Sequence, residues 1–317
     1  MIYKEVTGRL GNQMFQYATL KAYKKKYNLD DEIFLDFSKL KLLGTPEEGF
    51  CNQLVDFCID DYKSGKPKKS IKTNILIFYY KLMIYYILNK NEKNIYKYQK
   101  KHQSKMNKNG IFYFSYGYYD FPLINKKNKY FYGDFESPKY FQNIKEELYK
   151  SFTPKHKKLK KNNNMYKEIE NSNSVCISIR RGDFISNSEI SKKHLVCTED
   201  YYYKAIKEMN KLIKNPRYVV FSDDIEWCKK NLNFPKGTIY EEGNDPVWEK
   251  LRLMYSCKNF IISNSTFSWW AQYLSRNKDK VVIAPSKWKN YSYKEDGGFD
   301  IYEDNWILIQ SGNEKNV

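Results

Sequence analysis

The stretch V-C-I-S-I-R-R-G-D-F, residues 175–184, decides the fold of the second half of the chain. Its first five residues alternate large aliphatic side chains with Cys and Ser, a pattern that predicts a strand in a covered sheet. Arg180, Arg181, Gly182 and Asp183 follow at the carboxyl end of this strand, where open α/β sheets bind their ligands. A guanidinium offers phosphate a planar fork of donors, so the stretch predicts either a diphosphate site or an Arg–Asp ion pair that ends the strand.

Strands and helices alternate through the rest of this half. Strands are expected at 218–221, 238–240, 259–262, 281–285 and 305–309, and helices at 165–170, 201–214, 225–232, 246–256 and 271–274. Alternation with short connections predicts a parallel sheet that is covered by helices on both faces.

Two further polar groups follow strands of this sheet. Asp223 and Asp224 come after the strand at 218–221, and their carboxylates either bind a purine edge or ribose hydroxyls, or cap the next helix. Ser265 and Thr266 come at a helix start, where hydroxyl and N–H groups can donate to phosphate. For the two aspartates both interpretations stay open, and so does a double role.

The amino-terminal stretch T-G-R-L-G-N-Q-M-F-Q-Y-A, residues 7–18, is a glycine-rich loop that leads into a helix. Gly8 and Gly11 predict a tight turn with exposed N–H groups, and Asn12 and Gln13 open the helix. Such a helix terminus can bind an anion or a polar ligand, but the G-K-[ST] of a P-loop is absent. The alternative is an ordinary loop in which Asn12 caps the helix.

Residues 74–88 are apolar except for Lys81, with a helically spaced stripe at 75, 76, 79, 82, 83, 86 and 87. The segment is shorter than the roughly 20 apolar residues that span a bilayer. It predicts either a buried helix of the first domain or an interfacial helix that lies on a membrane. Flanking lysines suit the second interpretation, although lysine-rich runs are usually solvated faces.

The composition suits a two-domain protein with anionic partners. The chain has 317 residues, 41% of them hydrophobic, and a formal net charge of +18, which favours nucleic acid, an anionic membrane or phosphorylated substrates. The six cysteines are scattered without a CxxC pair, which indicates reduced thiols and argues against a disulfide scaffold or a zinc site. The three histidines are far apart in the sequence, which argues against a His-based metal site or a Ser-His-Asp triad. The start of the chain has no signal-peptide pattern, so we expect a cytoplasmic protein.

The stretch T-P-K-H-K-K-L-K-K-N-N-N, residues 153–164, is polar and lysine-rich and lacks periodicity. A composition shift follows it, which predicts a linker at this place. We therefore expect an amino-terminal domain over residues 1–155 and a carboxyl-terminal domain over residues 165–317.

Six motifs in this order resemble the family 11 glycosyltransferases, the bacterial and animal α-1,2-fucosyltransferases. They are GRLGNQMFQYA at 8–18, GDFESPKYF at 133–141, IRRGDF at 179–184, CTEDYY at 197–202, FSDDIEWC at 221–228 and SNSTFSWW at 263–270. The resemblance covers nearly the whole chain, although residues 50–111 show no such match. One position departs from the family, because Ser178 stands where a histidine usually precedes the first arginine by two residues.

The resemblance implies an α/β, GT-B-like enzyme of two Rossmann-like domains, with the donor cleft between them. It implies an inverting, metal-independent transfer of L-fucose from GDP-fucose to O2 of a galactose in a surface glycan, such as an O-antigen or a Lewis-type oligosaccharide. The expected partners are GDP-fucose, a galactose-terminated acceptor and, at the inner face of the plasma membrane, a peripheral contact with anionic lipid; no cofactor, metal or nucleic acid is expected. The sequence has no D-x-D motif, so arginine, N–H and hydroxyl groups must stabilise the leaving diphosphate.

Site residues follow from the resemblance motif by motif. It implies donor-binding residues, which are Arg180, Arg181, Ser222, Asp223, Asp224, Asn264, Ser265 and Thr266, and acceptor-side residues, which are Gly11, Asn12 and Gln13. The catalytic candidates are Arg180, Asp183 and Asn12. The general base stays open, because Asp183 is near in sequence but a late proton transfer to phosphate needs no protein base.

Two other functions also stay open. One is a glycosyltransferase of the same architecture that uses a different sugar nucleotide, which Ser178 supports. The other is a non-catalytic basic protein that binds glycan or nucleic acid, for which binding should depend steeply on salt and not on GDP. No nucleic-acid-binding motif in the sequence supports this last alternative.

Overall fold

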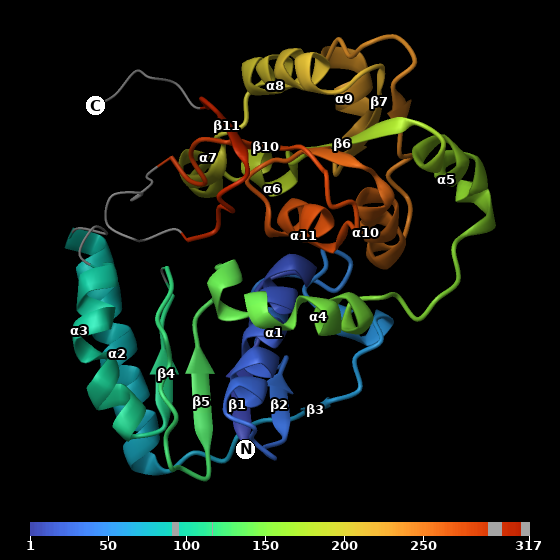
Figure 1. Ribbon diagram of the computed structural model, residues 1–317. Coiled ribbons are helices and arrows are strands. Elements are labelled where there is room, and N and C mark those ends of the chain that lie inside the picture. Colours follow the sequence, from blue (N-terminus) through green and yellow to red (C-terminus); the bar gives the residue numbers. More distant parts are fainter. Residues whose placement is uncertain (91–94, 116, 291–299, 312–317) are drawn as a thin grey trace. The chain divides into compact units, whose positions relative to one another are not determined.

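The computed structural model describes residues 1–90, 95–115, 117–290 and 300–311, which form two compact units (Figure 1). The first unit holds residues 1–153 with 300–302, and the second holds residues 154–290 with 303–311. Each unit is built on one parallel sheet with helices packed against it. The structure therefore has the two parallel α/β units of the GT-B-like class that the sequence predicts.

The first unit contains a five-stranded sheet in the order β3-β2-β1-β5-β4. The strands are β1 (Ile2–Glu5), β2 (Ile33–Asp36), β3 (Tyr62–Ser64), β4 (Ile111–Tyr113) and β5 (Lys129–Tyr132). Side chains alternate between the two faces, as a period of two requires. Tyr130 and Tyr132 join the core under α2, whereas Phe131 packs on Tyr23 of α1.

Helix α1 (Leu10–Lys26) covers one face of this sheet, and α2 (Ile71–Lys90) and α3 (Ile95–Lys108) cover the other (Figure 1). A short helix, α4 (Lys145–Ser151), follows β5. The amino-terminal cap of α1 is Arg9, three residues before the predicted opening at Asn12. The interpretation of Asn12 as the cap is therefore wrong, and its side chain is used elsewhere.

Helix α2 confirms the predicted helix at 74–88, but it is buried on one face only. Ile77, Tyr80 and Ile84 are at most 6% exposed and pack in the core of the first unit. The stripe that the spacing predicts as buried is largely open, since Ile75, Tyr79 and Leu82 are 61%, 59% and 51% exposed. A helix that is apolar all round has several stripes with helical spacing, so spacing alone cannot choose its buried face. Within the described ranges no helix is long and apolar enough to cross a bilayer.

The second unit contains a six-stranded parallel sheet in the order β11-β10-β9-β6-β7-β8. The strands are β6 (Asn173–Ile179), β7 (Pro216–Ser222), β8 (Ile239–Tyr240), β9 (Asn259–Ile261), β10 (Val282–Pro285) and β11 (Ile307–Ile309). Residues 175–179 of the stretch quoted first lie in β6, which together with β7 is the longest strand of this sheet, at seven residues each. Its alternation is confirmed, because Val175, Ile177 and Ile179 all enter one core with residues of α8.

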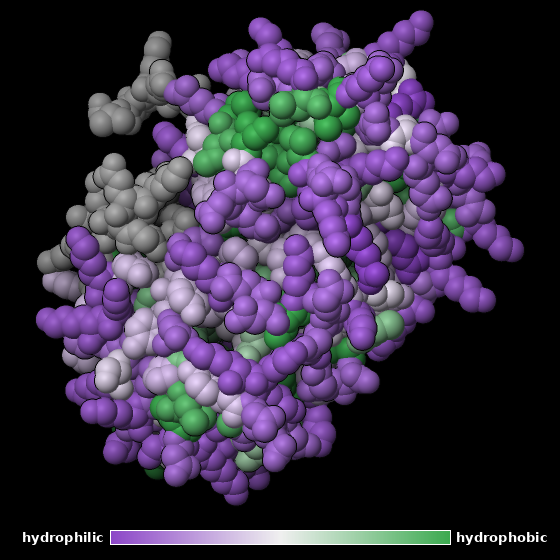
Figure 2. Space-filling view, viewed as in Figure 1, coloured by the Kyte–Doolittle hydropathy of each residue, from purple (hydrophilic) through white to green (hydrophobic). Residues whose placement is uncertain are grey.

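The helices of the second unit are α5 (Asn163–Glu170), α6 (Gly182–Ser186), α7 (Ser188–His194), α8 (Glu199–Leu212), α9 (Ile225–Asn231), α10 (Val247–Ser256) and α11 (Thr266–Leu274). Helices α8 and α9 lie on one side of the sheet, and α10 and α11 lie on the other (Figure 1). Hydrophobic side chains gather on the visible surface between α8 and β11 (Figure 2). Trp269 and Trp270 of α11 are fully buried, so they pack the core.

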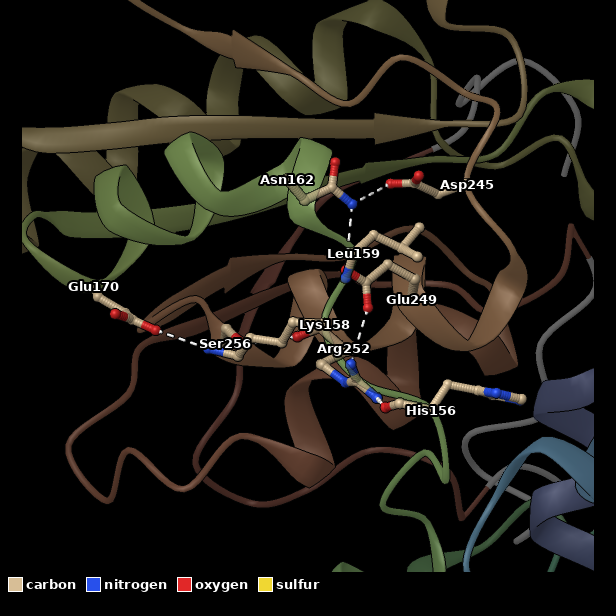
Figure 3. A network of polar contacts seen from close by, with 9 residues as sticks. All are labelled: His156, Lys158, Leu159, Asn162, Glu170, Asp245, Glu249, Arg252 and Ser256. Carbon is tan, nitrogen blue, oxygen red and sulfur yellow. Dashed lines mark hydrogen bonds and ion pairs between the residues drawn. The ribbon is translucent and has the colours of Figure 1, made fainter.

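The lysine-rich stretch at 153–164 is hydrogen-bonded to α10, chiefly through the buried carboxylate of Glu249 (Figure 3). Glu249, which is 0% exposed, accepts the backbone N–H of Leu159 at 2.9 Å and pairs with Arg252 at 3.1 Å. Arg252 in turn donates to the carbonyl of His156, and Asn162 donates to Asp245 at 2.7 Å. The composition of the stretch does not reveal this attachment, because its partners lie about ninety residues further along the chain.

Candidate active site

The carboxyl ends of β6, β7 and β9 lie at one edge of the second sheet, because the three strands are parallel and β6 pairs with both others. The chain builds β7 and β8 on one side of β6 and then crosses to build β9, β10 and β11 on the other. The strand order therefore reverses between β6 and β9. Ligands of open α/β sheets bind at such a switch point, beyond the carboxyl ends of the strands.

Two arginines leave β6 and are held by two carboxylates that leave β7. Arg180 Nη1 lies 2.6 Å from Asp223 Oδ2, and Arg181 Nε donates to Asp224 Oδ2 at 3.2 Å. The backbone N–H of Arg181 donates to Asp223 Oδ1 at 2.8 Å. The ion-pair alternative is thus present, with carboxylates supplied by β7. It does not exclude phosphate binding, because a guanidinium has five N–H donors and one carboxylate does not exhaust them.

Trp227 and Gly182 complete the support of the arginines. The Arg181 guanidinium lies over the indole of Trp227, with Cζ 3.2 Å from the ring centroid, which is a cation–π contact. At Gly182 a Cβ atom would come within 2.6 Å of Asp223 Oδ2. A larger residue at this position would therefore displace the carboxylate that holds Arg180. The side chains of Arg180 and Arg181 are 23% and 18% exposed, so both cations are held but reachable.

Asp224 has a double role in this arrangement. Its Oδ1 accepts the N–H of Trp227 at 3.4 Å and caps α9, while Oδ2 accepts from Arg181. Its own N–H donates to Ser222 Oγ at 3.0 Å. The helix-cap interpretation of Asp224 is confirmed, and contact of Ser222, Asp223 or Asp224 with a guanosine stays a prediction.

On the β9 side of the switch point, Ser265 is the amino-terminal cap of α11 and Thr266 is its first residue. The Ser265 side chain makes no capping hydrogen bond, which suits a hydroxyl that serves a ligand. Asn264 has a different task. It is 4% exposed, and its Nδ2 donates to the carbonyls of His194 at 2.8 Å and Trp288 at 2.9 Å. Asn264 therefore fixes the loop before α11, and its contact with a donor stays a prediction.

The hydroxyl of Ser178, which replaces the usual family histidine, joins a buried hydroxyl chain. Ser178 Oγ shares a hydrogen bond of 2.6 Å with Ser268 Oγ, which lies 3.1 Å from Ser263 Oγ. Ser178 is 7% exposed, and Ser268 and Ser263 are 1% and 0% exposed. This chain of hydroxyls ties β6 to α11 at a position two residues before the first arginine.

The first sheet has an equivalent switch point, between β1 and β5. The chain builds β2 and β3 on one side of β1 and then crosses to build β4 and β5 on the other. Two sequence motifs meet here: Asn12 Nδ2 donates to Glu136 Oε1 at 3.0 Å, and Thr7 Oγ1 donates to Asp134 Oδ1 at 3.0 Å. The loop after β1 is thus joined to the turn after β5, and both lie beyond the carboxyl ends of their strands.

Gln13 holds this loop from inside. It is 0% exposed; its Nε2 donates to the carbonyls of Gly8 at 3.1 Å and Cys51 at 2.8 Å, and its Oε1 accepts the N–H of Gln53. Gln53 Oε1 in turn accepts the N–H of Leu10 at 2.7 Å. The backbone N–H of Leu10, at the start of α1, is therefore hydrogen-bonded to a protein side chain. The side chain of Gln13 is taken up by this loop, whereas Asn12 is half-buried at the edge, and the acceptor-side role of both residues stays a prediction.

Glu136 and Lys4 belong to this edge but are absent from the residues predicted from sequence. Glu136 is the partner of Asn12. Lys4 is 2% exposed; burial lowers its pKa to about 8, against the opposing pull of the Asp134 carboxylate. The motif GDFESPKYF could have pointed to Glu136, because it places an acid directly after a strand. Nothing in the sequence pointed to Lys4 as a buried residue of this site, because a single lysine within a strand is usually exposed.

Asp183 lies in α6, directly after the arginines, and its side chain is outside what the structure describes. Its role as base or as partner of an arginine stays a prediction. Among the described residues, no group of three or more His, Cys, Asp or Glu is arranged to hold a metal ion. The described edge of β6, β7 and β9 therefore offers an anionic ligand two guanidinium groups, hydroxyls and N–H groups.

Comparison with known proteins agrees with the motifs. The model of "Glycosyl transferase family 11" matches residues 66–310, which hold five of the six motifs. The match leaves out the motif at 8–18 and includes residues 66–111, for which the motifs predicted no match. The Escherichia coli "O-antigen biosynthesis glycosyltransferase WbnK" is 32% identical over 90% of this chain and 94% of its own length. An Escherichia coli "Alpha-1,2-colitosyltransferase" is 31% identical over 98% of this chain and 99% of its own. The mouse "Galactoside 2-alpha-L-fucosyltransferase Sec1" is 31% identical over 36% of this chain and 31% of its own.

Two solved structures illustrate more distant likeness. The crystal structure of "NodZ alpha-1,6-fucosyltransferase soaked with GDP-fucose" aligns with a TM-score of 0.47 and 11% identity over 86% of this chain and 92% of that one. The structure of "E. coli ADP-heptose lps heptosyltransferase II" aligns with a TM-score of 0.42 and 11% identity over 97% of this chain and 89% of that one. The sequence match alone, which includes relatives above 30% identity along nearly the full length, shows that this chain belongs to glycosyltransferase family 11.

Proposed function

We propose that this glycosyltransferase moves L-fucose from GDP-fucose to O2 of a galactose residue in a surface glycan, with inversion at the anomeric carbon and without a metal ion. One observation carries the proposal. Arg180 and Arg181 stand together at the switch point of the second sheet, oriented by Asp223, Asp224 and Trp227. A fixed pair of guanidinium groups suits the diphosphate of a sugar nucleotide.

The proposed reaction uses these charges at the bond that breaks. The galactose O2 attacks the anomeric carbon of fucose from the face opposite GDP, and the bond from that carbon to the diphosphate oxygen breaks with its electron pair. Negative charge grows on the departing diphosphate, so contacts from Arg180 and Arg181 strengthen in the transition state. Charge-assisted hydrogen bonds contribute about 1.5–3 kcal/mol each. Ser265 and Thr266, at the amino terminus of α11, are proposed to donate to the same phosphates.

The proton of the attacking hydroxyl needs an acceptor. Glu136 is a carboxylate at the carboxyl end of β5, and Asn12 holds it by a 3.0 Å hydrogen bond. We propose Glu136 as the base of the acceptor side, with Asn12 as the group that orients it. Asp183 remains the second candidate, since it follows the donor arginines in sequence.

The sequence relatives support an acceptor on the bacterial surface. WbnK is named for O-antigen biosynthesis, and it matches this chain over 90% of its length. We propose that the acceptor is a galactose-terminated repeat of such a glycan. The place of action would be the cytoplasm, in peripheral contact with the inner face of the plasma membrane, which the formal charge of +18 suits.

A second candidate donor follows from one specific likeness. The α-1,2-colitosyltransferase is 31% identical over 98% of this chain, whereas the mouse galactoside 2-α-L-fucosyltransferase Sec1 is 31% identical over 36% of it. Colitose is fucose without the 3-hydroxyl group, so both sugars would present the same leaving diphosphate to Arg180 and Arg181. The hydroxyls of Ser178, Ser263 and Ser268 form one buried chain that starts two residues before Arg180, and we propose that this chain helps to tell the two donors apart.

The deciding experiment is a transfer assay in chelator. Purified protein is incubated with EDTA, a galactose-terminated acceptor and, in parallel, GDP-fucose or GDP-colitose, and the linkage of the product is read by NMR. We expect an α-1,2-linked product, with the better donor shown by its kcat/KM. Hydrolysis without transfer, or activity only after manganese is restored, would overturn the proposal.

A further inference from the structure

Helix α2 carries an exposed apolar face that the fold of the first unit does not use. Its opposite face, through Ile77, Tyr80 and Ile84, packs in the core with strands β1, β4 and β5. The outward side chains are each between 51% and 80% exposed: Ile71, Ile75, Phe78, Tyr79, Leu82, Tyr85 and Tyr86. Among the described residues, seven of the eleven large hydrophobic side chains that are more than half exposed are on this one helix. Single exposed apolar residues are ordinary, but a continuous row along a helix marks an interaction surface.

The charge around this face is one-sided. Residues 62–119 hold thirteen lysines and one glutamate, which gives this short part of the chain +12 of the total +18. Neither α2 nor α3 contains an acidic residue. The lysines at 66, 68, 72, 97, 100, 101, 105 and 108 are exposed. An apolar row beside a positively charged surface is complementary to an anionic lipid bilayer, which has negative headgroups and an apolar interior.

We propose that α2 is the membrane-docking element of this protein, and that it lies in the plane of an anionic bilayer surface with its open face among the acyl chains. The helix would rest at the interface, since its other face is committed to the core of the first unit. Tyrosines suit this depth, because the ring is apolar and the hydroxyl reaches the headgroups. Lysines of α3 and of the segment before α2 would contact the lipid phosphates.

The observations favour a lipid surface over a second copy of the chain. Two copies joined through α2 would bring two regions of +12 together, and like charges at close range oppose association. An anionic bilayer reverses this sign. Each lysine near such a surface strengthens binding by about fivefold, and the gain falls within a Debye length as salt is added.

The test is flotation of the full chain with lipid vesicles. Wild-type protein is mixed with vesicles of phosphatidylcholine and phosphatidylglycerol, or of phosphatidylcholine alone, at low and at high salt. We expect binding to the anionic vesicles that weakens as salt rises. The variant Ile75→Ser, Phe78→Ser, Leu82→Ser should bind at least about tenfold more weakly. Its control, Val55→Ser, Leu123→Ser, Leu212→Ser, removes three hydrophobic side chains elsewhere that are 46% to 55% exposed, and should bind as the wild type does.

A second pair of variants separates charge from apolar contact. Lys101→Gln, Lys105→Gln, Lys108→Gln should weaken vesicle binding and lower its salt dependence, whereas Lys207→Gln, Lys214→Gln, Lys278→Gln should not. Transfer to a soluble acceptor should be unchanged in all four variants, so this test does not depend on the donor or acceptor. Equal vesicle binding by the α2 variant and its control would overturn the proposal. Dimers that the α2 variant abolishes, with no vesicle binding by the wild type, would also overturn it.

Discussion

The two sheet edges at the switch points have the same topology and opposite chemistry. The β6–β9 edge of the second unit carries two arginines, and the described carboxylates at that edge serve to hold them. The β1–β5 edge of the first unit carries Glu136 and Asp134, held by Asn12 and Thr7, with Lys4 buried below. The difference supports the proposed division of labour, in which the second unit binds the anionic donor and the first unit binds the neutral, hydroxyl-bearing acceptor.

The largest effect should come from removing a donor-side arginine. Arg180→Ala removes positive charge where the diphosphate leaves, so kcat/KM should fall by about a thousandfold or more. Steady-state kinetics with GDP-fucose would measure it. Arg180→Lys should recover little, because an ammonium cannot keep the fork geometry toward Asp223 and phosphate.

Arg217→Ala is the matched control for this variant. Arg217 lies in the same unit and pairs with Glu168 at 3.3 Å, away from the switch point. Its loss should leave kcat/KM within about twofold, since exposed pairs contribute little. An equal fall in both variants would mean that lost stability, and not lost charge at the edge, explains the Arg180 result.

The next effect should come from the other edge and should leave the nucleotide untouched. Glu136→Gln keeps the shape and the hydrogen bond to Asn12 but removes the base, so kcat should fall by about a hundredfold. The dissociation constant of GDP should not change. If kcat stays at the wild-type value, Glu136 is not the base, and the proposed role of the β1–β5 edge in proton transfer is wrong.

A smaller effect should follow from the support of Arg181. Trp227→Ala removes the ring on which the guanidinium lies, and GDP binding should weaken by about tenfold. Trp227→Phe keeps an aromatic face and should recover most of the affinity. Affinity for GDP measured by calorimetry decides this, and equal weakening by Ala and Phe would argue against the cation–π contact as the cause.

The smallest predicted effect concerns Lys4, and it is a dependence of the free energy of unfolding on pH. Burial lowers the pKa of Lys4 to about 8 in the folded state, whereas its ordinary value is 10.5. The unfolded chain therefore binds more protons between these values, and stability should rise with pH in this window. From about pH 7.5 to 9.5 the gain should be about 2 kcal/mol.

Urea unfolding of the wild type and of Lys4→Met checks this sign. The wild type should gain stability over the window relative to the variant, in which no lysine has to lose its proton. Tyrosines with raised pKa, such as Tyr113 at about 12, reduce stability only near and above pH 10 and are shared by both proteins. A difference that is flat with pH would contradict the lowered pKa of Lys4.

Alternation and strand–helix order predicted all six strands of the second sheet and five helices of the described second unit, but not the short helices α6 and α7. The period of two in residues 175–179, and the polar residues after each strand, placed Arg180, Asp223 and Ser265 at one edge because all these strands are parallel. The sequence could not show which carboxylate holds which arginine. That depends on strand neighbours, and β7 enters the chain more than thirty residues after β6.

The first unit was harder to predict, for two physical reasons. The segment of α2 is apolar on every side, so its buried face is chosen by the tyrosine-rich sheet of β4 and β5 and not by its own spacing. Asn12 is a common cap residue type, but here its amide is taken by Glu136, which lies 124 residues away. Long-range partners override local preference at both places.

Calorimetric titration of GDP, in chelator, into the wild type, Arg180→Ala and Glu136→Gln tests the central claim most directly. If the second unit holds the nucleotide through its arginines, GDP should bind the wild type and Glu136→Gln alike and bind Arg180→Ala at least about tenfold more weakly. Equal GDP affinity in Arg180→Ala, or a loss in Glu136→Gln instead, would contradict the account.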